Sequence, residues 1–158
     1  MSKDWPATAR AIATATEDAV AAARAHSVED YRSAVSALEA EDSSQVGLVH
    51  AEIIKALLEE LHPDGLTGEN VQDVLTRTVR SSEWADAVDV DGFVEVLTGA
   101  LGVADTESPR PRPRVGHSVL VIADLMAARR AQDETVTPQL FVRRAIAEIE
   151  RAQTIEMP

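Results

Sequence analysis

The feature that most constrains the fold is a run of apolar residues in the first half of the chain. They recur at spacings of three and four residues, at Val46, Val49, Ile53, Ile54, Leu57, Leu58 and Leu61. This is the period of an α-helix that buries one wide stripe. The opposite face is charged and carries Glu52, Lys55, Glu59 and Glu60. The sequence predicts an amphipathic helix of about 18 residues, roughly 27 Å long, in which Ser43 or Ser44 is the N-cap.

Two more amphipathic helices are predicted directly after it. Thr67 is a suitable N-cap for the first of them, and Asp89 for the second. A short turn at 82–87 separates the two, and Gly102 stands where a helix favours a left-handed residue at its end. Three apolar stripes joined by short connections should bury one another. We therefore expect the hydrophobic core in residues 43–102.

The chain before this core predicts two helices. The first, Ala7 to Ala25, is rich in alanine, so each of its side chains buries little surface. We expect a peripheral helix there; the alternative is a small-residue surface that contacts another chain. The second begins at a capping-box variant, Ser27 to Asp30, and carries an apolar stripe from Val28 to Leu38.

The chain after the core begins without periodicity. Residues 103–116 form a predicted linker in which Pro109 to Arg114 alternate proline with arginine. Such a segment favours extended polyproline II. It is either a stiff spacer or a binding segment for an acidic surface, an anionic ligand or a domain that recognises proline-rich peptides. Residues 117–131 predict a buried helix, although the aliphatic run Val119 to Ile122 would also suit a buried strand. Thr137 and Pro138 then begin the last helix.

These elements predict an all-α protein, a single-domain bundle of six to eight amphipathic helices over residues 1–158. Its parts are the core (43–102), the linker (103–116) and the C-terminal helices (117–153). A chain of 158 residues is most often one domain. We expect roughly 60–70% of the residues to be helical, about twice the usual third.

Composition restricts the classes of function. The chain has no cysteine, so disulfides, thiolate metal sites and cysteine nucleophiles are excluded. No apolar run approaches the roughly 20 residues of a membrane span, which predicts a cytoplasmic protein. The formal net charge is −12, and residues 1–102 contribute all of it, with 7 basic and 19 acidic residues. This half would repel phosphate backbones, and aromatic residues are only 3%, so we expect no nucleic-acid partner. The preference for Ala, Val and Arg indicates a bacterial source.

Two groups of residues have the spacing of metal ligands, but both lack essential partners. Glu59 and His62 are three residues apart, as in carboxylate-bundle sites, yet no second Glu-x-x-His pair exists. A second group is acidic and comprises Glu83, Asp86, Asp89, Asp91 and Glu95. Its Asp-x-Asp-Gly core is typical of a calcium loop, but alanine and threonine occupy the first and twelfth ligand positions. We therefore predict no metal and no cofactor.

His50 and Asp124 are the remaining candidates for chemistry. His50-x-Glu52 matches half of a zinc-deaminase pattern whose paired cysteines are absent, so His50 is predicted to lie at the edge of the core. Asp124 interrupts the apolar helix at 117–131. We expect it on an exposed edge that it shares with His117, Ala128 and Ala131; the alternative is a buried Asp124, which would be a functional candidate. No nucleophile elbow or phosphate-binding loop occurs.

No catalytic site emerges from these patterns, so the sequence favours a non-enzymatic protein-interaction or assembly module. Its partner would be another protein or a second copy of the chain, as a homodimer. The alternative is a small-ligand-binding or regulatory domain with an apolar pocket between helices. A flat, exposed apolar patch would favour the first function, and a concave open pocket would favour the second.

Overall fold

The computed structural model describes residues 5–85, 88–102 and 115–156, and this part of the chain is helical for 82% of its length. It contains seven helices and no strand: α1 (Trp5–Ala25), α2 (Val28–Glu39), α3 (Ser43–Leu61), α4 (Gly68–Ser81), α5 (Val90–Ala100), α6 (Val115–Gln132) and α7 (Pro138–Glu156). The prediction of an all-α bundle of six to eight helices is confirmed. The alternative of a strand at Val119 to Ile122 is wrong, because these residues lie inside α6.

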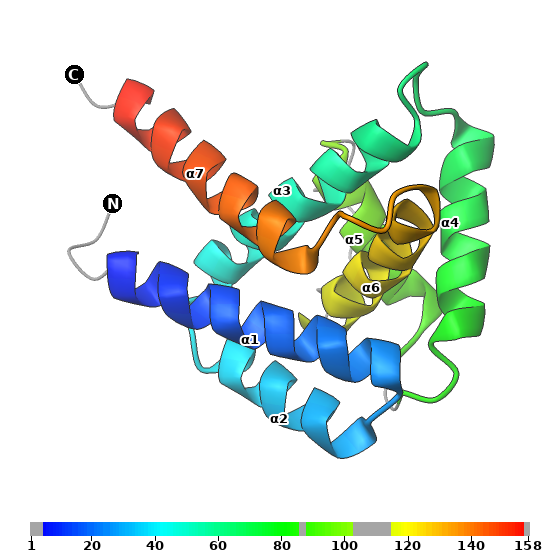
Figure 1. The fold of residues 1–158 in the computed structure, drawn as a ribbon, viewed down its shortest axis with the longest axis horizontal. Coiled ribbons are helices and arrows are strands. Elements are labelled where there is room, and N and C mark those ends of the chain that lie inside the picture. Colours follow the sequence, from blue (N-terminus) through cyan, green and yellow to red (C-terminus); the bar gives the residue numbers. More distant parts are fainter. Residues whose placement is uncertain (1–4, 86–87, 103–114, 157–158) are drawn as a thin grey trace.

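Helix α6 lies at the centre of the bundle. It packs against each of the helices α1 to α5, whereas α1 and α2 form an adjacent pair on one side of it (Figure 1). Helix α7 lies across α1 and α3, and α4 lies at the end of the molecule opposite the two termini (Figure 1). Aliphatic residues on all sides of α6 therefore have a physical explanation: this helix meets neighbours in every direction.

The hydrophobic core is wider than the stretch 43–102 in which we expected it. Helix α3 contributes its predicted stripe, with Leu57 fully buried, but α4 contributes only Val74 among its apolar residues. The other large contributions come from α6 and from α1. Nine residues of α1 are buried, so the expectation of a peripheral helix was wrong. Small alanine side chains let the backbones of neighbouring helices approach closely. Each alanine buries little area, but together they bury a large one.

Local capping explains where most helices begin. Thr67 and Asp89 are N-caps as predicted, and the Asp89 side chain accepts a hydrogen bond from the Gly92 N–H at 2.7 Å. The cap of α3 is Asp42, which accepts from the Gln45 N–H at 3.1 Å, and neither Ser43 nor Ser44 has this role. A carboxylate is the stronger choice at this position because it also favours the positive end of the helix dipole.

The start of α6 differs from the prediction by two residues. The predicted linker extended to residue 116, but Val115 and Gly116 already belong to the helix. A Cβ at Gly116 would lie 2.5 Å from the Tyr31 hydroxyl of α2, so the missing side chain allows this close approach. The alternating Pro109 to Arg114 segment lies outside the described residues.

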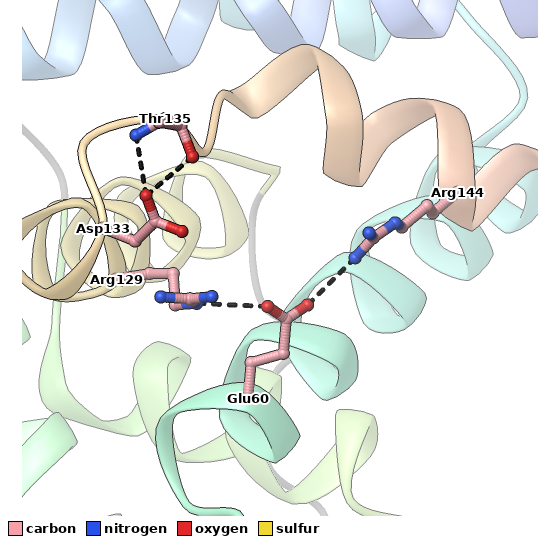
Figure 2. Close-up of polar contacts among 5 residues, drawn as sticks. All are labelled: Glu60, Arg129, Asp133, Thr135 and Arg144. Atoms are coloured by element: carbon pink, nitrogen blue, oxygen red, sulfur yellow. Dashed lines mark hydrogen bonds and ion pairs between the residues drawn. The ribbon is translucent and has the colours of Figure 1, made fainter.

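An ion-pair cluster joins the ends of three helices (Figure 2). Glu60 of α3 accepts hydrogen bonds from Arg129 Nε of α6 and from Arg144 Nη1 of α7, each at 3.1 Å. In the loop between α6 and α7, Asp133 accepts from the N–H of Thr135 at 3.0 Å and from its hydroxyl at 2.6 Å. These hydrogen bonds lower the pKa of Asp133 below its usual value. The cluster fixes α7 against α3 and α6.

Candidate functional site

One concave feature of the surface is an open cavity of about 610 Å³. The C-terminal part of α1, the end of α4, most of α6 and the start of α7 line it. Its apolar wall includes Val20, Leu120, Ala123, Met126 and Ala127. The volume is within the range of about 300–1,000 Å³ found for small-molecule sites. We refer to it as the α1–α6 cavity.

Asp124 lies in the wall of the α1–α6 cavity, and the expectation that it occupies an exposed edge was wrong. Its side chain is only 6% exposed and forms a two-pronged ion pair with Arg77 of α4. Arg77 Nε and Nη2 donate to Asp124 Oδ2 at 3.0 and 2.9 Å, and Nε also approaches Oδ1 at 3.3 Å. The helical period could not show this pairing, because the partner comes from a helix 47 residues away.

Two hydroxyl groups at the end of α4 are buried beside this ion pair. Thr78 and Ser82 are 0% and 1% exposed, and neither Thr78 Oγ1 nor Ser82 Oγ has a hydrogen-bond partner in the described part of the chain. Ser82 also lines the α1–α6 cavity. A buried hydroxyl without a partner costs roughly 1–3 kcal/mol. The sequence spacing indicates their burial, because Thr78 and Ser82 follow the buried Val74 at intervals of four residues and lie on the same face of the helix.

Aromatic rings form one side of the entrance to the cavity. The Trp84 ring stacks on the His26 ring, with centroids 5.2 Å apart and 13° between the planes, and meets Tyr31 edge-on at 5.1 Å. His26 has φ +55°, a left-handed backbone conformation that residues other than glycine seldom adopt. This turn ends α1, since the His26 and Ser27 N–H groups donate back to Ala23 and Ala22. The turn therefore positions the His26 ring over Trp84.

A second polar group lies inside the bundle and links α1, α3 and α6. His50 is 2% exposed, and both ring nitrogens have partners. Nε2 lies 2.9 Å from Thr16 Oγ1, and Nδ1 lies 2.6 Å from Ser118 Oγ. His50 was expected at the edge of the core; instead it occupies the interior. We call these three residues the Thr16–His50–Ser118 seam.

The direction of the hydrogen bonds in the seam follows from one contact. The Ser118 hydroxyl donates to the Val115 carbonyl at 2.8 Å, so its only proton is already used. The His50 Nδ1–H must then donate to Ser118, and Nε2 accepts from the Thr16 hydroxyl. Burial lowers the pKa of His50 to about 4, so the ring is neutral near pH 7. A serine that keeps its proton beside such a weak base is not activated as a nucleophile, and we assign the seam a structural role.

His117 is also buried, contrary to the exposed edge expected for it. It is 3% exposed, its Nε2 accepts from the Asp89 N–H at 3.1 Å, and its ring meets Phe93 edge-on. A Cβ at Gly92 would lie 2.3 Å from His117 Nε2, so this ring fits only against a glycine. His117 thereby supports the start of α5.

The residues with metal-ligand spacing do not form a site in the described part of the chain. Glu59 is exposed, and His62 caps the end of α3 beside Pro63. Asp89 caps α5, and Asp86 lies outside the described residues. Over the ranges the structure covers, no three acidic or histidine side chains converge as metal ligands would. Nor does any helix there have the length and apolar character needed to cross a membrane.

Comparisons with protein-family models, with curated proteins and with solved structures each found no match to this chain.

Proposed function

We propose that the protein binds a small organic molecule in the α1–α6 cavity. The observation that carries this proposal is the cavity itself, whose wall includes Ser82, a residue with a buried hydroxyl that has no hydrogen-bond partner among the described residues. A ligand atom reaches this hydroxyl when the Ser82 side chain rotates toward the cavity. The wall combines apolar residues, most of them from α6, with charged and hydroxyl side chains, so it offers a ligand both apolar surface and polar contacts.

The surface of the described residues favours a ligand over a flat protein interface. Only two large apolar side chains there are strongly exposed, Leu48 of α3 and Val90 of α5, each at 49%. Isolated exposed apolar residues are normal on monomeric proteins, whereas interaction sites present contiguous patches. The concave feature is therefore the better-supported alternative of the two functions that the sequence allows.

The test uses N-phenyl-1-naphthylamine, a neutral apolar probe whose fluorescence rises on binding in a cavity. Ala127 is an exposed residue in the wall of the cavity, so Ala127→Phe should fill part of it without disturbing the core. We expect this variant to weaken probe binding at least tenfold. The matched control is Ala147→Phe, at an exposed position of α7 outside the cavity wall, which should bind like the wild type. Equal binding by all three proteins, or none by the wild type, would contradict the proposal.

A second candidate function is self-association, which one feature of the structure supports. An open groove of about 920 Å³ runs between α1 and α2, and most of its wall is alanine and serine. Small side chains allow the helix of a second copy to approach closely. Helix α6 does not need a second copy to cover its aliphatic residues, since it packs against α1 to α5 of its own chain.

Light scattering after size exclusion tests this second candidate at low and high salt. Two copies that each carry −12 repel, so an apolar contact should strengthen with salt as the repulsion is screened. Ala22→Arg, in the buried wall of the groove, and Ala37→Arg, at an exposed position of it, should abolish any dimer. A monomer at tens of micromolar protein in both salts would exclude the homodimer.

A further inference from the structure

The charges around the α1–α6 cavity differ in sign from those of the whole chain. Its wall contains two arginines, Arg24 and Arg130, and two acidic residues, Asp124 and Glu134. Asp124 is already neutralised by Arg77. The group of five therefore has one more positive than negative charge, in a protein whose net charge is −12. A local excess of positive charge at a cavity favours an anionic ligand.

Arg24 is the cation best placed to bind such a ligand. It is exposed in the last turn of α1, and no carboxylate of the described residues pairs with it. Arg130, by contrast, donates through Nη1 to the Val136 carbonyl at 2.8 Å and holds the start of α7. Asp124, the other charge deep in the wall, has both oxygens engaged by Arg77. The guanidinium of Arg24 thus has its donors free at the cavity entrance.

The depth of the wall residues gives the orientation of the ligand. Leu120, Met126 and Ser82 are almost fully buried, whereas Arg24, Ala127 and Glu134 are exposed. An apolar body would enter along α6 toward Leu120 and Met126, and a charged head would remain at the entrance. A planar carboxylate matches the fork of guanidinium donors, which gives two parallel hydrogen bonds.

We infer that the ligand of this cavity is a monocarboxylate with an apolar body, and that Arg24 binds its carboxylate at the entrance. This inference rests on the proposed function. Beyond the proposed function, this inference specifies the charge of the ligand and names Arg24 as the residue that selects for that charge. A single excess positive charge suits one carboxylate and offers too little for a doubly charged phosphate.

The test compares three competitors of equal chain length that displace N-phenyl-1-naphthylamine: octanoate, octanol and octylammonium. Octanoate should displace the probe at a concentration at least tenfold lower than the other two. In Arg24→Gln this advantage should disappear, measured as the ratio of the octanoate and octanol concentrations that displace half of the probe, because a change in probe affinity cancels in that ratio. The matched control is Arg10→Gln, another exposed arginine of α1 that lies outside the cavity wall, and it should keep the full preference.

The outcomes of this experiment distinguish a failure of the inference about Arg24 from a failure of the proposed cavity. If the probe binds but octanoate has no advantage, or if Arg24→Gln leaves that advantage intact, the inference about Arg24 is overturned and the proposed cavity stands. A preference for octylammonium would also overturn it and would implicate Glu134. Absence of probe binding by the wild type would instead contradict the proposed function itself.

Discussion

Two groups of buried polar residues in this bundle contrast with each other. In the Thr16–His50–Ser118 seam, every donor and acceptor of the imidazole has a partner, and the chain of hydrogen bonds ends on a backbone carbonyl. At the end of α4, Asp124 is paired with Arg77, but the hydroxyls of Thr78 and Ser82 have no partner among the described residues. Among the described residues, the polar atoms of the first group are fully paired, and two hydroxyls of the second group are not.

This difference is the basis on which we assign the first group to structure and propose the second for binding. A satisfied buried network makes packing specific, and its polar atoms have no unmet hydrogen bond to offer a ligand. An unsatisfied hydroxyl lowers stability, and a ligand that supplies its partner recovers that free energy on binding. The contrast predicts that substitutions in the seam reduce stability strongly, whereas substitutions at Ser82 change binding with little loss of stability.

The largest expected effect is on the seam. His50→Ala would leave a void between α1, α3 and α6 and would strand the Thr16 hydroxyl. We expect a loss of about 3–5 kcal/mol in the free energy of unfolding, measured by urea denaturation. Glu59→Ala, on the exposed face of the same helix, is the control and should change stability by no more than about 0.5 kcal/mol. Equal losses from both would mean that the seam is not a structural element.

The pH dependence of stability isolates the imidazole. Because the pKa of His50 falls from 6.5 to about 4 on folding, the unfolded chain takes up this proton first as the pH decreases. The contribution of His50 to the free energy of unfolding is therefore greatest above pH 6.5, and it is lost as the pH falls from 6.5 to 4. It amounts to about 3 kcal/mol in total, of which about 2 kcal/mol is lost by pH 5.

Urea denaturation at pH 7.5 and pH 5 measures this loss, with His50→Gln as the reference. Glutamine retains hydrogen-bonding groups but does not titrate, so the difference between the two proteins removes the contributions of other groups. Parallel pH profiles would show that His50 is protonated as readily in the fold as outside it.

The ion pair at the cavity should give an intermediate effect. Arg77→Leu leaves the buried Asp124 carboxylate without its partner, and we expect a loss of about 1–2 kcal/mol. This is below the roughly 3–5 kcal/mol of a fully buried pair, because the Arg77 side chain is 47% exposed and water can replace part of it. The double variant Arg77→Leu, Asp124→Leu should recover most of the loss. A double variant no more stable than the single one would show that the unpaired charge is not the cause.

The smallest effect on stability is predicted for Ser82→Ala. The substitution removes a hydroxyl that has no partner, so the free energy of unfolding should stay within about 0.5 kcal/mol or rise by up to about 1 kcal/mol. Thermal unfolding checks this. A loss above about 1 kcal/mol would show that the Ser82 hydroxyl is satisfied in the native protein and would remove it from the proposed site.

Most of the fold followed from local patterns in the sequence. The spacing of Val46 to Leu61 located α3, and Thr67 and Asp89 located the starts of α4 and α5, because a helix face and an N-cap depend only on residues a few positions apart. The length of α6 and the role of α1 did not follow. Alanine-rich and uniformly apolar helices have no one-sided pattern, so their position depends on how their neighbours pack.

The candidate site followed from the sequence far less. Asp124 and His50 were noticed, but their partners Arg77, Thr16 and Ser118 lie 34 to 68 residues away. No local period connects residues on different helices. Glu60 likewise belonged to a charged face, and only the packing of α6 and α7 gave it two arginine partners.

The most direct test of the central claim is to locate a bound ligand on the folded protein. Titration with octanoate, followed by backbone and methyl NMR chemical shifts, reports on both polar groups at once. We predict saturable shifts at Leu120, Met126 and Ser82 in the α1–α6 cavity, and unchanged shifts at Thr16 and Val49 beside the seam. Shifts that centre on the seam, or no saturable shifts in the cavity, would contradict the assignment of the first group to structure and the second to binding.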